Sequence, residues 1–357
     1  MSVDQALCLG LKKFPGGVLP QYTFLALWGM WGKTGIDIFI LISGYFMCKS
    51  NMTIRRYCKV FFEIYFYQFV IYIIMLALGY ETFGKMRIYH LLFDVFQFAN
   101  ASGYFECSFL IFYLFVPFMN KFINAVNRQE YRRFVLLLLF VFTGMSTFFR
   151  NVVIFGEVFW FMAVYFIGGY LRIYPPEWSK NLKQSVKLLI FSILFSCGFA
   201  LLVIYKLSEY KFNNIQYAFF VSDANKLGAV LVSVFLFTTF KNLKIGYSRF
   251  INYIASTTFG VLLIHANSNA QRQFMWKDML HVDTNYCLPM YVLIPKTIII
   301  VVGVFVCCSL VDMIRIQLIE KPVFNHFESI EYGIRTLWQF IKMSIKKVYG
   351  CILVVFR

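Results

Sequence analysis

The chain has 357 residues, of which 60% are hydrophobic and 20% aromatic, and its mean hydropathy is +0.68. Only 14% of the residues are charged, against about 25% in a typical soluble domain. A soluble fold could not bury this much apolar surface, so that class is excluded. The formal net charge of +17 is expected from the positive-inside rule and from contact with anionic membrane lipids, and we expect no nucleic-acid partner.

Apolar runs long enough to cross a bilayer recur along the whole chain. A transmembrane helix needs about 20 mostly apolar residues. The sequence therefore predicts an all-α fold, a polytopic transmembrane helical bundle of about nine spans. The predicted spans are 31–48, 57–79, 106–124, 133–149, 152–171, 186–206, 227–240, 251–268 and 290–312.

Most Lys and Arg residues fall on alternate connections between these spans, beginning with the connection after the first span. By the positive-inside rule these connections face the cytoplasm. We therefore expect residues 1–30 to form an outer N-terminal segment, residues 31–325 the transmembrane domain, and residues 326–357 a tail with a cytoplasmic C-terminus. The tail combines basic residues with apolar residues at helical spacing, which predicts an amphipathic helix on the inner leaflet.

Four short motifs occur in order within or beside these runs. Gly35–Phe46 reads Gly-Ile-Asp-Ile-Phe-Ile-Leu-Ile-Ser-Gly-Tyr-Phe, and Phe166–Leu171 reads Phe-Ile-Gly-Gly-Tyr-Leu. Ser256–His265 reads Ser-Thr-Thr-Phe-Gly-Val-Leu-Leu-Ile-His, and Ile319–Pro322 reads Ile-Glu-Lys-Pro. Together they resemble the membrane acyltransferase 3 family, and the resemblance spans residues 31–325.

The resemblance implies a multi-pass protein of the bacterial plasma membrane, usually with ten helices. Such proteins transfer an acyl group, often acetyl from cytoplasmic acyl-CoA, to an acceptor. We expect the acceptor to be a sugar hydroxyl of a cell-surface or lipid-linked glycan. The resemblance implies acyl-CoA as the donor substrate and no metal. It does not predict the oligomeric state.

The family's first helix normally carries an Arg followed by a His that serves as the catalytic base. This chain has no His before His90, so we expect it to lack that helix and to be impaired in activity as it stands. A sugar hydroxyl is a poor nucleophile, and a positioned base contributes about 10²–10⁴-fold to the rate of its reaction.

Three ionisable residues in the apolar runs are the candidate catalytic residues: Asp37, His265 and Glu157. An ionisable group in hydrocarbon costs about 2.5–3.5 kcal/mol on insertion scales and is expected to face protein or water. For Asp37 two alternatives remain. It either has a functional role, in which it orients a catalytic His or lines the acceptor cavity, or it is simply solvated at the outer interface. For His265 the alternatives are an auxiliary base and a structural His at the interface. Glu106 is a further embedded acid.

Arg55, Arg56 and Lys59 form a basic group after the first span. In the family a similar pair at this place implies binding of the acyl-CoA phosphates. The alternative is that these residues only anchor the helix at the inner face. The small pair Ser43-Gly44 is expected to let two helices approach closely.

A second class of function fits the same residues. A transporter or glycan flippase could move its solute past Asp37, Glu157 and His265 without chemistry. Such a protein would not require an upstream helix with an Arg and a His.

Overall fold

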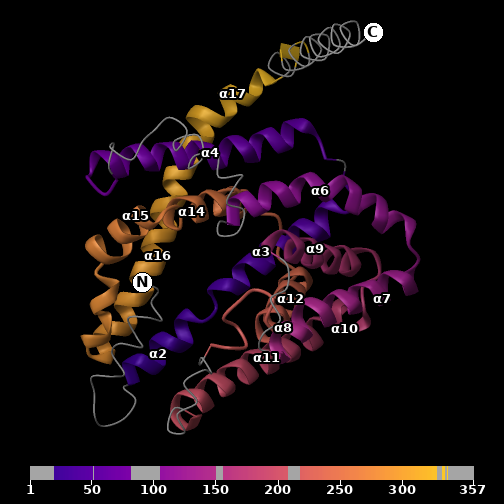
Figure 1. The fold of residues 1–357 in the computed structure, drawn as a ribbon, viewed down its shortest axis with the longest axis horizontal. Coiled ribbons are helices and arrows are strands. Elements are labelled where there is room, and N and C mark those ends of the chain that lie inside the picture. Colours follow the sequence, from indigo (N-terminus) through magenta and orange to yellow (C-terminus); the bar gives the residue numbers. More distant parts are fainter. Residues whose placement is uncertain are drawn as a thin grey trace, which may run out of the picture.

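The computed structural model describes residues 20–50, 52–81, 105–149, 156–207, 218–327, 332–333 and 336. In these ranges all regular elements are helical, as predicted (Figure 1). The α-helices are α2 (Pro20–Gly29), α3 (Gly32–Met47), α4 (Ile54–Ala77), α6 (Phe105–Ala125), α7 (Arg128–Leu138), α8 (Ser146–Phe148), α9 (Glu157–Ile173), α10 (Glu177–Lys180), α11 (Leu182–Leu202), α12 (Leu227–Asn242), α13 (Arg249–Ala255), α14 (Thr258–His265), α15 (Asn269–Arg272), α16 (Met290–Arg315) and α17 (Lys321–Asn325). The π-helical segments are η3 (Leu139–Met145), η4 (Val203–Leu207), η5 (Gln273–Met279) and η7 (Ile316–Glu320), and the 3₁₀ segment is η6 (Val282–Cys287).

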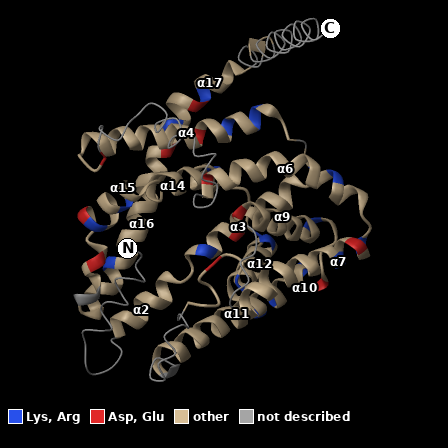
Figure 2. Cartoon of the chain, viewed as in Figure 1, with Lys and Arg blue, Asp and Glu red and all other residues tan. Residues whose placement is uncertain are grey.

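Six helical stretches in the described part of the chain are long and apolar enough to cross a membrane. They are Pro20–Met47, Ile54–Ala77, Phe105–Ala125, Arg128–Phe148, Leu182–Tyr205 and Met290–Asn325. The shorter apolar helix Leu227–Asn242 joins them in the bundle. Figure 2 shows long uncharged stretches of ribbon in several of these helices. The polytopic helical bundle is thus confirmed, whereas its orientation in the membrane stays a prediction.

Several predicted spans differ from the observed helices; the predicted span 152–171 is described only from residue 156, with α9 (Glu157–Ile173) as its helix. The first candidate span begins at Pro20, not at residue 31, because α2 precedes α3 with a short break at Met30-Trp31. The last continues past residue 312 to Asn325. The expected span 251–268 is two helices, α13 and α14. The hydroxyls of Ser256 and Thr257 donate to backbone carbonyls three residues earlier, at 2.7 and 2.8 Å, and such bonds compete with the regular helix ladder.

The basic tail lies almost entirely outside the described residues. Its amphipathic surface helix therefore stays a prediction.

Helices α3 and α9 pack backbone against backbone at two glycines. A Cβ on Gly44 would collide with the backbone oxygen of Tyr165, and a Cβ on Gly168 would lie 2.5 Å from the carbonyl oxygen of Leu41. Small residues let membrane helices approach this closely. The prediction that Ser43-Gly44 serves close packing is confirmed, and the glycine of the second motif is its partner.

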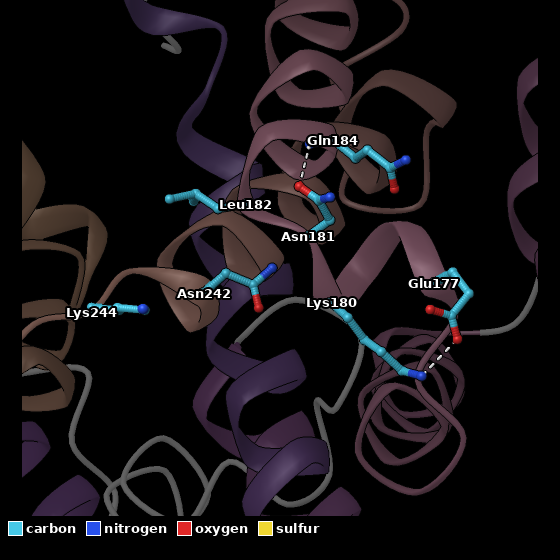
Figure 3. A pocket seen from close by; sticks show the side chains of 7 residues that line it. All are labelled: Glu177, Lys180, Asn181, Leu182, Gln184, Asn242 and Lys244. Atoms are coloured by element: carbon cyan, nitrogen blue, oxygen red, sulfur yellow. Dashed lines mark hydrogen bonds and ion pairs between the residues drawn. The ribbon is translucent and has the colours of Figure 1, made fainter.

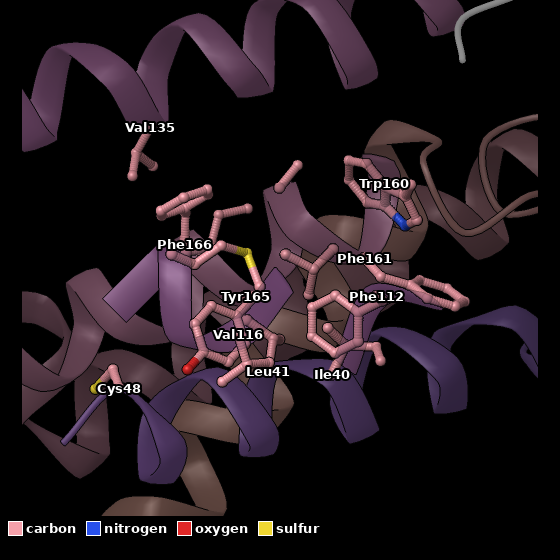
Figure 4. Close-up of a cluster of buried hydrophobic side chains, with 14 of the residues drawn as sticks. Ile40, Leu41, Cys48, Phe112, Val116, Val135, Trp160, Phe161, Tyr165 and Phe166 are labelled. Atoms are coloured by element: carbon pink, nitrogen blue, oxygen red, sulfur yellow. The ribbon is translucent and has the colours of Figure 1, made fainter. Parts of the chain in front are cut away.

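Helix α6 packs against both α3 and α9 and completes this core. Figure 4 shows Ile40 and Leu41 of α3 close to Phe161 and Tyr165 of α9 and to Phe112 of α6. The side chain of Asn120 on α6 donates to the carbonyls of Met47 and Ser50 at 2.9 and 3.3 Å, and its oxygen accepts a hydrogen bond from Tyr165 at 2.6 Å. This amide ties the end of α3 and the following turn to α6, adding to the bonds that Ser50 makes to the Met47 carbonyl.

The glycine contact predicts a specific cost of adding one methyl group. Gly44→Ala should lower the free energy of unfolding by about 1–3 kcal/mol, because the new Cβ overlaps rigid backbone and the helices must separate. Gly198→Ala on α11 is the control, since nothing lies within 4 Å of its Cβ position. Unfolding temperatures of the purified proteins in detergent measure the difference. Equal temperatures for the two variants would contradict the close contact.

Candidate functional site

Asp37 is buried between α3, α9 and α12. It is 2% exposed, and its Oδ1 accepts a hydrogen bond from the indole Nε1 of Trp160 at 2.9 Å. The nearby hydroxyl of Ser233 donates to the carbonyl of Thr34 at 3.1 Å, and Oδ2 of Asp37 has no hydrogen-bond partner in the described part of the chain. The alternative of a solvated acid at the outer interface is therefore wrong: Asp37 faces the protein interior with one oxygen unpaired.

Asp37 lies well inside the longer first candidate span, Pro20–Met47. With a helical rise of about 1.5 Å per residue, it lies about 15 Å along the helix from Met47, a length equal to half of a hydrocarbon core of about 30 Å. The prediction that the span starts at residue 31 had placed it near the surface. The tight pairing of α3 with α9 then sets Trp160 at the same depth.

Two further acids begin the neighbouring helices. Glu157 is the first residue of α9, one turn before Trp160, and its Oε2 is buried without a partner among the described residues. Glu106 lies in the first turn of α6 and is 6% exposed. The carboxylates of Glu106 and Glu157 are close enough to repel each other electrostatically, and the guanidinium of Arg272 attracts the Glu106 carboxylate.

His265 ends α14 in a defined hydrogen-bonding arrangement. Its Nδ1 lies 2.6 Å from the carbonyl oxygen of Val261. A carbonyl only accepts, so Nδ1 carries the proton and Nε2 is left with a lone pair when the ring is neutral. Trp276 packs edge-on against the ring at 6.2 Å and donates to the His265 carbonyl at 3.2 Å. Arg272 acts electrostatically on His265 as well as on Glu106.

The three predicted catalytic residues therefore fall into two neighbouring groups. Asp37 and Glu157 lie beside Trp160, and no hydrogen bond joins either of them to His265 within the ranges that the structure describes. Aromatic pairs join the helices that carry these residues: Phe39 of α3 stacks on Phe259 of α14 at 5.6 Å, and Phe105 of α6 packs edge-on against Phe161 of α9 at 5.3 Å. Glu106 interacts electrostatically with Glu157 and with Arg272, and Arg272 interacts with His265. We call these five ionisable residues, Glu106, Glu157, Asp37, His265 and Arg272, the acidic site.

The residues predicted to bind acyl-CoA are largely used for packing α4 against the end of the described chain. Arg55 donates to the carbonyl of Phe324 at 2.8 Å. Lys59 forms an ion pair with Glu320 at 2.6 Å, although its side chain is still 53% exposed. Arg56 is exposed and acts electrostatically on Tyr113 of α6. Arg56 is at the exposed start of α4, next to the end of α3, where the acyl-CoA phosphates were expected.

A buried ionic cluster, most of which is not predicted from the sequence, lies next to Lys59. The guanidinium of Arg315 is bound by Asp312 at 2.7 Å, Glu320 at 2.6 Å and Glu63 at 2.9 Å. Tyr67 donates to Asp312 at 2.7 Å. We call these five residues the Arg315 cluster. Glu63 and Asp312 stand inside predicted spans, and an acid in such a place is a functional or structural candidate by default, so the signal was present.

The Arg315 cluster explains two of the four motifs. A Cβ on Gly260 would collide with the carboxylate of Asp312, so the glycine of the third motif lets α14 pass beside α16. Glu320 of the fourth motif binds both Arg315 and Lys59, and it thereby joins α4 to the end of the last span.

A polar pocket of about 760 Å³ lies elsewhere, at the start of α11 and the end of α12 (Figure 3). Its polar groups are mostly bound by protein: Lys180 pairs with Glu177 at 2.7 Å, Asn181 accepts from the backbone of α11, and Asn242 donates to the Ser179 carbonyl at 2.9 Å. We therefore assign it no ligand.

The Arg315 cluster generates a stability prediction. Arg315→Met removes the central cation and leaves three buried carboxylates uncompensated, which should cost about 3–5 kcal/mol of unfolding free energy. Lys321→Met, which removes an exposed cation bonded only to Gln317 among the contacts found, is the control and should change stability by less than about 0.5 kcal/mol. Thermal unfolding in detergent compares the two variants. Similar unfolding temperatures would contradict a central role for Arg315.

Comparison with known proteins identifies the family. Residues 8–313 match the model of the acyltransferase domain of the acyltransferase 3 family. No curated protein and no solved structure matched the chain. The family match covers most of the chain, including the acidic site and Asp312 of the Arg315 cluster. The chain therefore belongs to the membrane acyltransferase 3 family.

Proposed function

We propose that this chain is an integral membrane O-acyltransferase that moves an acyl group, most simply acetyl, from cytoplasmic acyl-CoA to a sugar hydroxyl of a cell-surface or lipid-linked glycan. The observation that supports it most is the acidic site. Buried carboxylate oxygens without partners cost free energy unless a ligand satisfies them, and hydroxyl groups of a sugar are suitable donors.

The reaction requires a base, an acceptor and a leaving group. The acceptor hydroxyl gives its proton to Nε2 of His265 as its oxygen attacks the thioester carbonyl of acyl-CoA. The carbon–oxygen bond forms, the carbon–sulfur bond breaks, and the thiolate of CoA takes the proton from the imidazolium. Oδ2 of Asp37 and Oε2 of Glu157 accept hydrogen bonds from other hydroxyls and orient the sugar.

The depth of the acidic site suits two substrates that arrive from opposite sides. Asp37 lies about 15 Å along α3 from Met47, and Arg56 follows at the start of α4. Phosphates of acyl-CoA held near Arg56 leave the thioester to reach inward, while a glycan acceptor reaches the same depth from the other side. The exposed position of Arg56 supports this arrangement, and Lys59 contributes while it remains paired with Glu320.

The role of His265 predicts a large effect on transfer. His265→Gln should reduce the transfer of radiolabelled acetyl from acetyl-CoA to membrane glycan by about 10²–10⁴-fold. His326→Gln is a matched control, because His326 has the same contact with a carbonyl four residues earlier but is exposed. Unimpaired transfer by His265→Gln would exclude His265 as the base. Asp37→Asn preserves the shape of the side chain and should weaken binding of the glycan acceptor.

The role of Arg56 predicts a selective effect on the donor. Arg56→Ala should raise the KM for acetyl-CoA with little change in the KM for the acceptor, because one cationic contact to phosphate is lost. Lys183→Ala, an exposed cation on α11, is the control. A KM for acetyl-CoA that stays unchanged would contradict the donor role.

Lipid vesicles that contain the purified chain and a lipid-linked glycan separate the enzyme from a flippase. If glycan crosses the bilayer but no acylated product forms with any acyl-CoA, the proposed chemistry fails. The transporter alternative would then account for the acidic site.

A further inference from the structure

An apolar groove of about 700 Å³ runs along α7 and η3, where these elements meet α9 and α12. Its volume lies within the range of about 300–1,000 Å³ found for small-molecule sites. The walls include Leu136, Leu139, Phe140, Ile167 and Val234. The groove has no part in the acidic site or the Arg315 cluster.

The groove opens on a surface that faces lipid in a membrane-spanning chain. Leu136 is 54% exposed and Phe140 is 62% exposed, and both belong to the candidate span Arg128–Phe148. The widened turns of η3 form part of the wall, and π-helical turns of this kind are frequent at functional sites. An apolar hollow of this size forfeits van der Waals contacts if it stays empty, and water finds few polar partners in it. An apolar chain is the occupant that its lining favours.

One end of the groove is basic. Arg128 and Arg132 line it there, and no hydrogen bond or ion pair to either guanidinium is found among the residues that the structure describes. Glu177 is at the same rim, but Lys180 binds its carboxylate at 2.7 Å and lowers its pKa, with a smaller contribution from Arg128. The rim therefore keeps a surplus of positive charge.

The length of the groove matches one leaflet. Thr143 lines the other end, and with the α-helical rise of about 1.5 Å per residue as an upper limit it lies at most about 16 Å along the helix from Arg132. One leaflet of a bilayer with a hydrocarbon core of about 30 Å has nearly this depth. Trp178 and Tyr170 also line the groove, and Trp and Tyr are typical of the boundary between headgroups and hydrocarbon.

We propose that this groove is a binding site for an anionic glycerophospholipid of the leaflet on the Arg128 side. The phosphate lies against Arg128 and Arg132, and one acyl chain extends along Leu136 and Leu139 toward Thr143. The arginines supply the charge-assisted hydrogen bonds that phosphate prefers, whereas the apolar walls distinguish this site from one for free phosphate.

The experiment measures retention of phosphatidylglycerol by the full chain in nanodiscs that contain phosphatidylcholine and a small fraction of fluorescent phosphatidylglycerol. The double variant Arg128→Gln/Arg132→Gln should bind phosphatidylglycerol about thirtyfold more weakly, because each basic side chain near an anionic surface contributes about fivefold. Arg133→Gln is the matched control: Arg133 is exposed on the same helix but does not line the groove. Val234→Phe keeps both arginines and fills the hollow.

The proposal expects loss of binding in the double variant and in Val234→Phe, with binding retained in Arg133→Gln. Loss in the double variant but not in Val234→Phe would show phosphate contact without the groove and would overturn the proposal. An equal loss in Arg133→Gln would show attraction by charge alone and would also overturn it. Displacement of the lipid by inorganic phosphate or acyl-CoA at equal concentration would likewise overturn the proposal. Unfolding temperatures of all variants show that each one is folded.

Discussion

The direct backbone contact between α3 and α9 is the constraint on which the acidic site depends. Gly44 and Gly168 remove the side chains that would hold the two helices apart. At the resulting distance the indole of Trp160 reaches Oδ1 of Asp37 at 2.9 Å, and the first turn of α9 brings Glu157 to the same region. The two glycines thus contribute no chemistry themselves. The close packing that they allow sets where the buried carboxylates lie, with one oxygen of each left for a ligand.

The Arg315 cluster fixes the relative positions of helices that include the later part of the chain. Three carboxylates around one guanidinium join α4, α16 and η7 within the bundle. A buried ion pair adds little net stability relative to an apolar contact, but it strongly penalises any arrangement that separates the partners. Lys59 extends the cluster toward the surface, so a residue expected to bind a substrate also holds the structure together. Arg56 is exposed at the start of α4, where the donor was expected.

The sequence was sufficient to predict the helical bundle, because long apolar runs have few other solutions. It also predicted the close contact at Ser43-Gly44. It could not show that Asp37 is buried inside the protein, because that depends on the packing of α3 against α9 and α12. Nor could it show which acids meet Arg315: Glu63 and Asp312 are far apart in sequence, and only the packing of α4 against α16 brings them together.

The account depends most on the claim that the acidic site binds the acceptor. A cryo-electron microscopy structure of the full chain in nanodiscs with acetyl-CoA and a glycan acceptor tests this directly. The account predicts density for a sugar ring within hydrogen-bond distance of Oδ2 of Asp37 and Oε2 of Glu157, with the reacting hydroxyl toward Nε2 of His265. Ordered acceptor bound elsewhere, with these oxygens still unpaired, would contradict it.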